Sequence, residues 1–102
     1  MRLIYRPLFL ADVEACADYL ASEANEAVVA AWHQALKKAL QRIQEVPEIG
    51  RVRQDLPLPG IRSLNLRQYP NYLIFYRLEK GAIELLRVRH GMMHLPDLFS
   101  DE

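Results

Sequence analysis

The chain has 102 residues, of which 51% are hydrophobic, so it is long enough and apolar enough to fold around a core. Lys and Arg (13) balance Asp and Glu (13), so no global positive field favours non-specific binding of nucleic acid. The single cysteine, Cys16, excludes an internal disulfide, and no apolar run approaches the roughly 20 residues that a membrane span needs. We expect one cytoplasmic domain over residues 1–102, with the last few residues flexible.

The balanced charge is distributed unevenly along the chain. Residues 1–50 carry 5 basic and 7 acidic side chains, residues 51–91 carry 8 and 3, and residues 92–102 carry 0 and 3. Charge that segregates by segment is more informative than its total. The pattern predicts a basic surface contributed by the second half of the chain.

The first half of the chain predicts a short strand and a helix. Residues 2–6 alternate and favour a strand, and Pro7 suits the first turn of the helix, which we expect over Leu8–Ser22. Apolar residues at helical spacing form its buried stripe and leave Asp12 on another face. That stripe consists of Leu10, Val13, Ala17, Leu20 and Ala21.

A second helix follows after a short gap, so the two helices should form an antiparallel hairpin. Asn25 is a suitable N-cap, and the helix should end near Val46 because Pro47 restricts the residue before it. We expect Trp32 to anchor the core. The apolar stripe is Val29, Trp32, Leu36, Ala39, Leu40 and Ile43.

Three strands complete the chain after a loop over Glu48–Gly60. They are expected at Ile61–Arg67, Tyr72–Leu78 and Ala82–His90, and the short turns between them imply antiparallel neighbours. The last strand is apolar on both faces, as central strands are, and it ends in a cationic segment.

The predicted fold class is therefore α+β, with the order β-α-α-β-β-β and the helical hairpin packed on one face of a twisted antiparallel sheet. The other face of the sheet should stay open and be lined by Tyr5, Tyr72 and Tyr76 together with strand arginines. The apolar tail over residues 92–102 is expected to fold back on the sheet.

Several kinds of chemistry fit the sequence poorly. The three histidines have no Cys or carboxylate at ligand spacing, so we expect no metal, and without a glycine-rich phosphate loop we expect no cofactor. Cys16 lies among small apolar residues and reads as an inert thiol. The remaining candidate chemistry is the binding of phosphates or carboxylates by arginine guanidinium groups. The predicted partner-binding residues are Arg51, Arg53, Arg62, Arg67, Arg87, Arg89 and His90.

Two other interpretations of these cations stay open. Arg62, Arg87 and His90 would form a ribonuclease site if His90 served as acid or base. Any single arginine also fits an ordinary surface role or a pair with Glu79 or Glu84.

Six fragments follow one another along the sequence: A-D-V-E-A-C-A-D-Y-L-A from Ala11, N-E-A from Asn25, V-P-E-I-G-R from Val46, G-I-R from Gly60, Y-L-I-F-Y from Tyr72 and L-L-R-V-R-H-G from Leu85. In this order and spacing, they resemble the ParE/RelE superfamily of small bacterial toxins. The resemblance implies the same fold and a toxin of a type II toxin–antitoxin module, neutralised by an antitoxin that wraps over it.

The resemblance is closer to the ParE-like branch, whose members block DNA gyrase, than to the RelE-like branch, whose members cut mRNA inside the ribosome. RelE-like enzymes carry lysines where this chain has Ser63 and Asn65, and an arginine where Leu73 follows Tyr72. No tyrosine occurs after Tyr76. One departure cuts the other way: family members often continue H-G-x-R-D, whereas this chain continues His-Gly-Met-Met-His from residue 90.

The resemblance thus implies a ParE-like toxin that inhibits DNA gyrase by binding, acts without being an enzyme and forms a hetero-oligomer with its antitoxin. The alternatives are a ribosome-dependent mRNA endoribonuclease and an antitoxin-binding module that has lost its toxicity. We expect no membrane partner and no sequence-specific contact with nucleic acid. The antitoxin should present an amphipathic helix or an added strand, with acidic residues against Arg51, Arg53 and Arg62.

Overall fold

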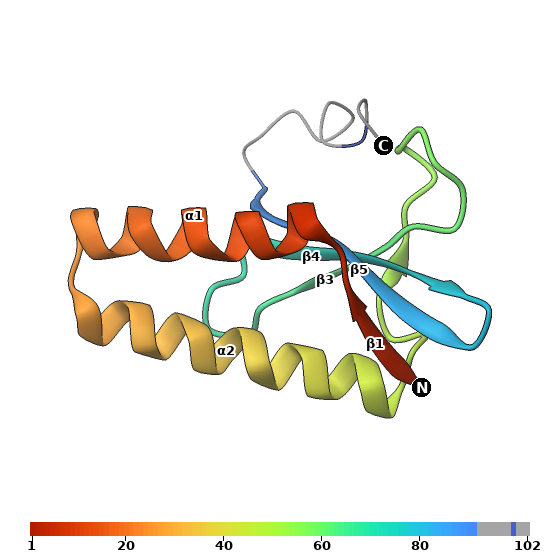
Figure 1. The fold of residues 1–102 in the computed structure, drawn as a ribbon, viewed down its shortest axis with the longest axis horizontal. Coiled ribbons are helices and arrows are strands. Elements are labelled where there is room, and N and C mark those ends of the chain that lie inside the picture. Colours follow the sequence, from red (N-terminus) through yellow and green to blue (C-terminus); the bar gives the residue numbers. More distant parts are fainter. Residues whose placement is uncertain (92–98, 100–102) are drawn as a thin grey trace.

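The computed structural model describes residues 1–91 and Phe99, and its elements follow the predicted order (Figure 1). One short strand, β2 (Arg51–Val52), was not predicted and lies inside the expected loop. The elements are β1 (Arg2–Tyr5), α1 (Pro7–Glu23), α2 (Glu26–Glu45), β2 (Arg51–Val52), β3 (Arg62–Asn65), β4 (Tyr72–Glu79) and β5 (Ala82–His90). Neither α1 nor α2 has the length and apolar character needed to cross a membrane.

The two helices lie side by side as an antiparallel hairpin (Figure 1). Pro7 occupies the first turn of α1, and the side chain of Asn25 caps α2 by accepting a hydrogen bond from the Val28 N–H at 3.0 Å. Helix α2 stops at Glu45, and Val46 is its C-cap ahead of Pro47. The predicted boundaries of both helices are confirmed to within a residue or two.

The five strands form one mixed sheet in the order β1-β5-β4-β3-β2. Strands β2 to β5 pair antiparallel, but β1 pairs parallel with β5, with Arg2 opposite Ala82. The prediction of an entirely antiparallel sheet is therefore wrong at this edge. Short turns dictate antiparallel pairing only between consecutive strands, whereas β1 and β5 are joined through the whole domain.

The main core lies between the helical hairpin and the sheet. Trp32 is fully buried in it, as predicted, together with Tyr76 and Ile83. Helix α1 faces this core with Phe9, not with Leu10, which is 53% exposed. The predicted stripe of α1 is therefore wrong at its start, because three consecutive apolar residues, 8–10, leave its phase ambiguous.

The opposite face of the sheet is also covered, contrary to prediction. Tyr72 and Tyr76 point into the helix-facing core, while the alternate residues of β4 point the other way. There, the ring of Phe99 packs edge-on against Phe75 with centroids 5.8 Å apart. This second cluster comprises Leu56, Ile61, Phe75, Leu86 and Phe99, flanked by Leu58 and Leu73. The remaining expectations for the tail concern residues outside the described part of the chain.

Candidate functional site

Asp12, a buried carboxylate of α1, accepts hydrogen bonds from the end of β5. Asp12 is 5% exposed and accepts hydrogen bonds from Arg87 Nε at 2.7 Å, Arg87 Nη2 at 3.0 Å and the Val88 N–H at 3.1 Å. Arg89 Nη1 lies 3.6 Å from the same carboxylate. β1 pairs with β5 only as far as Leu85, so on this side of β5 Asp12 takes the place of a strand neighbour for the Val88 N–H. Placing Asp12 off the buried face of α1 was wrong.

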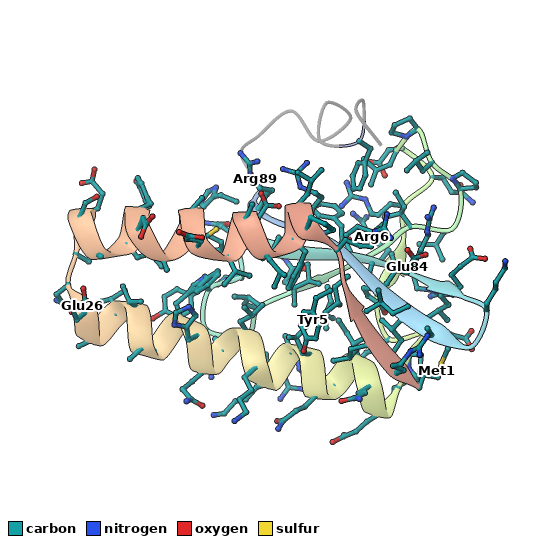
Figure 2. The ribbon with its side chains drawn as sticks, in the orientation of Figure 1. Met1, Tyr5, Arg6, Glu26, Glu84 and Arg89 are labelled. Atoms are coloured by element: carbon teal, nitrogen blue, oxygen red, sulfur yellow. The ribbon has the colours of Figure 1, made fainter. Side chains whose placement is uncertain are left out.

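A recess of about 400 Å³, here called the α1–β5 recess, opens beside this carboxylate. Its walls come from α1 and from the adjoining ends of β4 and β5, and Figure 2 shows Arg89 lying beside α1. The lining residues are Asp12, Ala15, Cys16, Tyr19, Tyr72, Arg89 and His90. The ring of Tyr72 contacts His90 and Trp32 edge-on, at 5.2 and 5.6 Å between centroids, and so connects the recess to the core.

The electrostatics of the recess favour binding over nucleophilic chemistry. Burial, assisted by the nearby Asp12 carboxylate, raises the pKa of the Cys16 thiol to about 11, although Arg89 acts in the opposite direction. Burial also raises the pKa of Tyr72. Both groups are uncharged at neutral pH, so Cys16 is a poor nucleophile, in line with the inert thiol predicted from its sequence context.

The predicted arginines Arg51 and Arg53 lie at the opposite edge of the sheet, in and just after β2. Arg51 is exposed, but Arg53 is buried. The guanidinium of Arg53 donates to both carboxylate oxygens of Asp55 at 2.9 and 2.7 Å and to Ser63 Oγ at 3.2 Å, and it lies over the ring of Phe75. Hydrogen bonding from Arg53 lowers the pKa of Asp55 to about 2. The donors of Arg53 are thus committed inside the domain.

Arg62 likewise forms its hydrogen bonds within the domain, with the segment that follows α2. Its Nη1 donates to the carbonyls of Glu48 and Gly50 at 3.1 and 2.9 Å, and its Nη2 lies 3.7 Å from the Glu48 carboxylate. The hydroxyl of Tyr76 accepts from the Gly50 N–H and donates to the Pro47 carbonyl, both at 2.8 Å. Arg51, Arg53 and Arg62 therefore lie near one another, and two of them hold loops in place.

The structure does not gather the three residues of the nuclease interpretation. Arg62 lies on β3 opposite Tyr76, while Arg87 and His90 lie on β5, and β4 runs between these strands. Arg87 bonds Asp12 on α1, and Arg62 bonds the loop after α2. Within residues 1–91 and Phe99, no cluster of three His, Cys, Asp or Glu side chains is placed to hold a metal ion.

Other strand charges form structural pairs, as the alternative interpretation allowed. Glu84 is buried on β5 and accepts from Arg77 Nε at 3.0 Å, while Arg6 Nε lies 3.8 Å from it (Figure 2). Arg67 is exposed and lies apart from the other predicted residues, near Arg42 of α2.

Of the residues that line the α1–β5 recess, Arg89 and His90 were predicted as partner-binding residues, whereas Asp12, Ala15 and Tyr19 were not predicted from the sequence. A stripe through Phe9, Val13, Cys16 and Leu20, in place of the one through Leu10, puts Asp12 beside the buried face. A carboxylate on the buried face of a helix needs a cationic partner. The strand that ends in Arg87 and Arg89 could have been identified from the sequence as the source of that partner.

Two helices packed on one face of a five-stranded mixed sheet define an α+β fold that is also found in toxin–antitoxin systems. A chain described as "Chromosomal ParDE TA system from P. aeruginosa" superposes with a TM-score of 0.75 and 22% identity, covering 88% of this chain and 95% of that chain. The family model described as "ParE toxin of type II toxin-antitoxin system, parDE" matches residues 3–95. The chain therefore belongs to the ParE toxin family, and the ParE-like interpretation is confirmed. A search of curated proteins found no match.

Proposed function

We propose that this toxin-family protein inhibits DNA gyrase by binding to it, and that a cognate antitoxin prevents this by occupying the α1–β5 recess. The observation that carries the proposal is the family match over residues 3–95. The geometry supports binding over catalysis, because Arg62 is separated from Arg87 and His90 and because the Cys16 thiol has a raised pKa.

The chemistry of the α1–β5 recess suits an amphipathic protein segment. Tyr19 is 58% exposed and, with Ala15 and Tyr72, offers apolar surface on which a partner's hydrophobic side chain can pack. Arg89, whose side chain is 28% exposed, and His90 lie at the rim. A carboxylate of the same partner segment would accept hydrogen bonds from Arg89.

A supercoiling assay tests the choice of target. Purified protein added to gyrase and relaxed plasmid should block supercoiling, and equimolar antitoxin should restore it. Ribosome-bound mRNA incubated with the same protein should stay intact. Unchanged supercoiling at a large excess of the protein would overturn the gyrase proposal, and cleavage of the mRNA would replace it with the nuclease alternative.

Two substitutions in the α1–β5 recess test its role separately from the choice of target. Arg89→Glu and Tyr19→Ala should each weaken antitoxin binding at least tenfold, which corresponds to about 1.4 kcal/mol. Lys80→Glu is the matched control, since Lys80 is exposed in the β4–β5 turn, at the far end of β5 from Arg89. Affinity that is unchanged in the two recess variants would place the antitoxin elsewhere on the domain.

A further inference from the structure

A second recess lies between α2 and the connection from β3 to β4. Its volume is about 290 Å³, and it adjoins another of about 240 Å³ with which it shares Ala35, Lys38 and Gln68. Together they form one groove, here called the α2 groove. The first part is also lined by Gln41, Arg42, Glu45 and Arg67, and the second part by Ala31, Gln34 and Tyr69.

Three cations converge on the α2 groove. Lys38 and Arg42 are one helical turn apart on the same face of α2, and Arg67 approaches from the β3–β4 connection. Across the part of the chain that the structure describes, no ion pair engages any of the three, and Glu45 is the single acid lining the first part of the groove. The positive charge of this groove is therefore largely uncompensated.

Arg42 is incompletely satisfied within the folded chain. Among residues 1–91 and Phe99, its buried Nε has no hydrogen-bond partner, and its Nη2 makes a long contact of 3.4 Å with the Asn65 carbonyl. A ligand cannot reach the buried Nε, but the long Nη2 contact leaves the terminal nitrogens of this guanidinium, which lines the groove, able to donate to an added acceptor. Burial, followed by the charge of Arg67, lowers the pKa of Arg42, which agrees with two cations held close together without an anion.

We propose that the α2 groove binds the phosphate group of a nucleotide. Arg42 and Arg67 supply guanidinium forks that match phosphate oxygens, and Lys38 adds a third positive charge. One carboxylate would neutralise a single cation, so three converging cations fit a phosphate better. Gln34, Gln68 and Tyr69 line the adjoining part of the groove and offer amides and an aromatic ring to the attached sugar and base.

This proposal is independent of the gyrase proposal and of the α1–β5 recess, since none of the residues that line the α2 groove lines that recess. The nucleotide chemistry can come from a free nucleotide or from one within a DNA strand. Both present the same phosphate to the three cations, and the experiment separates them.

Titration by NMR tests the groove with inorganic phosphate, 5′-AMP and a fluorescein-labelled DNA 12-mer. Each probe should bind saturably and shift the Arg42 and Arg67 side-chain signals. Equal affinity for AMP and the 12-mer would identify a free nucleotide as the ligand. Binding of the 12-mer that is tighter by tenfold or more would identify a DNA strand as the ligand. Lys38→Gln/Arg67→Gln should weaken each of the three at least tenfold. Both side chains are exposed, so this variant should fold normally.

Two controls keep the test specific. Lys37→Gln removes an exposed cation adjacent in sequence that does not line the groove, and it should leave binding within twofold. Arg42→Lys keeps the charge but loses the fork, so it should weaken AMP binding severalfold. Absence of shifts at Arg42 and Arg67 would overturn the proposal, and so would a polyglutamate peptide that binds as tightly as the 12-mer.

Discussion

Asp12 and Arg87 lie 75 residues apart in the chain, and the Arg87 Nε is 2.7 Å from the Asp12 carboxylate. The same carboxylate accepts the Val88 N–H at 3.1 Å, so one side chain of α1 holds both a side chain and the backbone of β5. It also forms a wall of the α1–β5 recess. The shape of that recess therefore depends on an interaction between the first helix and the last strand.

Asp12→Ala should lower the free energy of unfolding by about 3 kcal/mol, because it removes the buried acceptor shared by the Arg87 guanidinium and the Val88 N–H. Urea denaturation followed by circular dichroism measures the change. Asp18→Ala, on an exposed position of the same helix, is the control and should change stability by less than about 0.5 kcal/mol. Equal stability of the two variants would contradict the role assigned to Asp12.

Tyr76→Phe should destabilise the fold by about 1–3 kcal/mol, because the buried Gly50 N–H loses its acceptor and the Pro47 carbonyl loses its donor. Tyr19→Phe is the matched control, since Tyr19 is 58% exposed, and it should be nearly neutral. Amide exchange of Gly50 should accelerate in Tyr76→Phe. Protection of that amide at the wild-type level would show that the hydroxyl does not hold this segment.

Gly50→Ala should be strongly destabilising for a related reason. An added Cβ would lie 2.6 Å from Tyr76 Oη and 2.7 Å from Tyr76 Cε1, closer than real Cβ contacts. Removing the hydroxyl as well, in Gly50→Ala/Tyr76→Phe, should fail to restore stability because the ring carbon still clashes. A thermal melt of the double variant that equals that of Tyr76→Phe would contradict this.

The Arg53–Asp55 pair should make stability pH-dependent in acid. Asp55 has a pKa near 2 in the folded state, below its ordinary value of 3.8, so its contribution is present above about pH 4 and is lost as the pH falls toward 2. Asp55→Asn should therefore be less stable than the wild type at pH 6, and the difference should shrink between pH 4 and pH 2. Thermal melts across this range provide the measurement, and a difference independent of pH would count against the pair.

Alkylation of Cys16 should report on the α1–β5 recess. With a pKa near 11, the folded thiol should react slowly with iodoacetamide at pH 8 and faster as the pH approaches 11. Arg89→Gln removes a charge that lowers this pKa, so it should slow the reaction at pH 9 further. Protein unfolded in urea should react with an ordinary thiol profile, and an identical profile in the folded protein would contradict the raised pKa.

The helical hairpin was predictable because its signals are local. Asn25 caps α2, Pro7 and Pro47 mark boundaries, and Trp32 lies within a clear apolar stripe. The parallel pairing of β1 with β5 was not predictable in this way, because nothing in the neighbourhood of either strand records which distant segment will lie beside it.

The faces of β4 were not predictable from alternation. Residues 72–76 are apolar or aromatic at every position, so both faces of the strand are predicted to be buried. The pattern therefore does not indicate toward which face Tyr72 and Tyr76 point. The candidate site was predicted in part, since Arg87, Arg89 and His90 do lie together at the end of β5. Asp12 and Tyr19 were missed because they come from α1, whose apolar stripe was predicted to start at Leu10 and not at Phe9. Arg53 and Arg62 were predicted as a partner surface without their internal acceptors, which only the folded chain reveals.

The pairing of β1 with β5 has a consequence for how the domain forms. The first strand has no sheet neighbour until the segment from Ala82 onward is available, and Asp12 has no partner until Arg87 is. Closing such a long loop is entropically unfavourable, so the sheet should complete late and in one cooperative event. A chain interrupted before β5 would lack both the completed sheet and the α1–β5 recess.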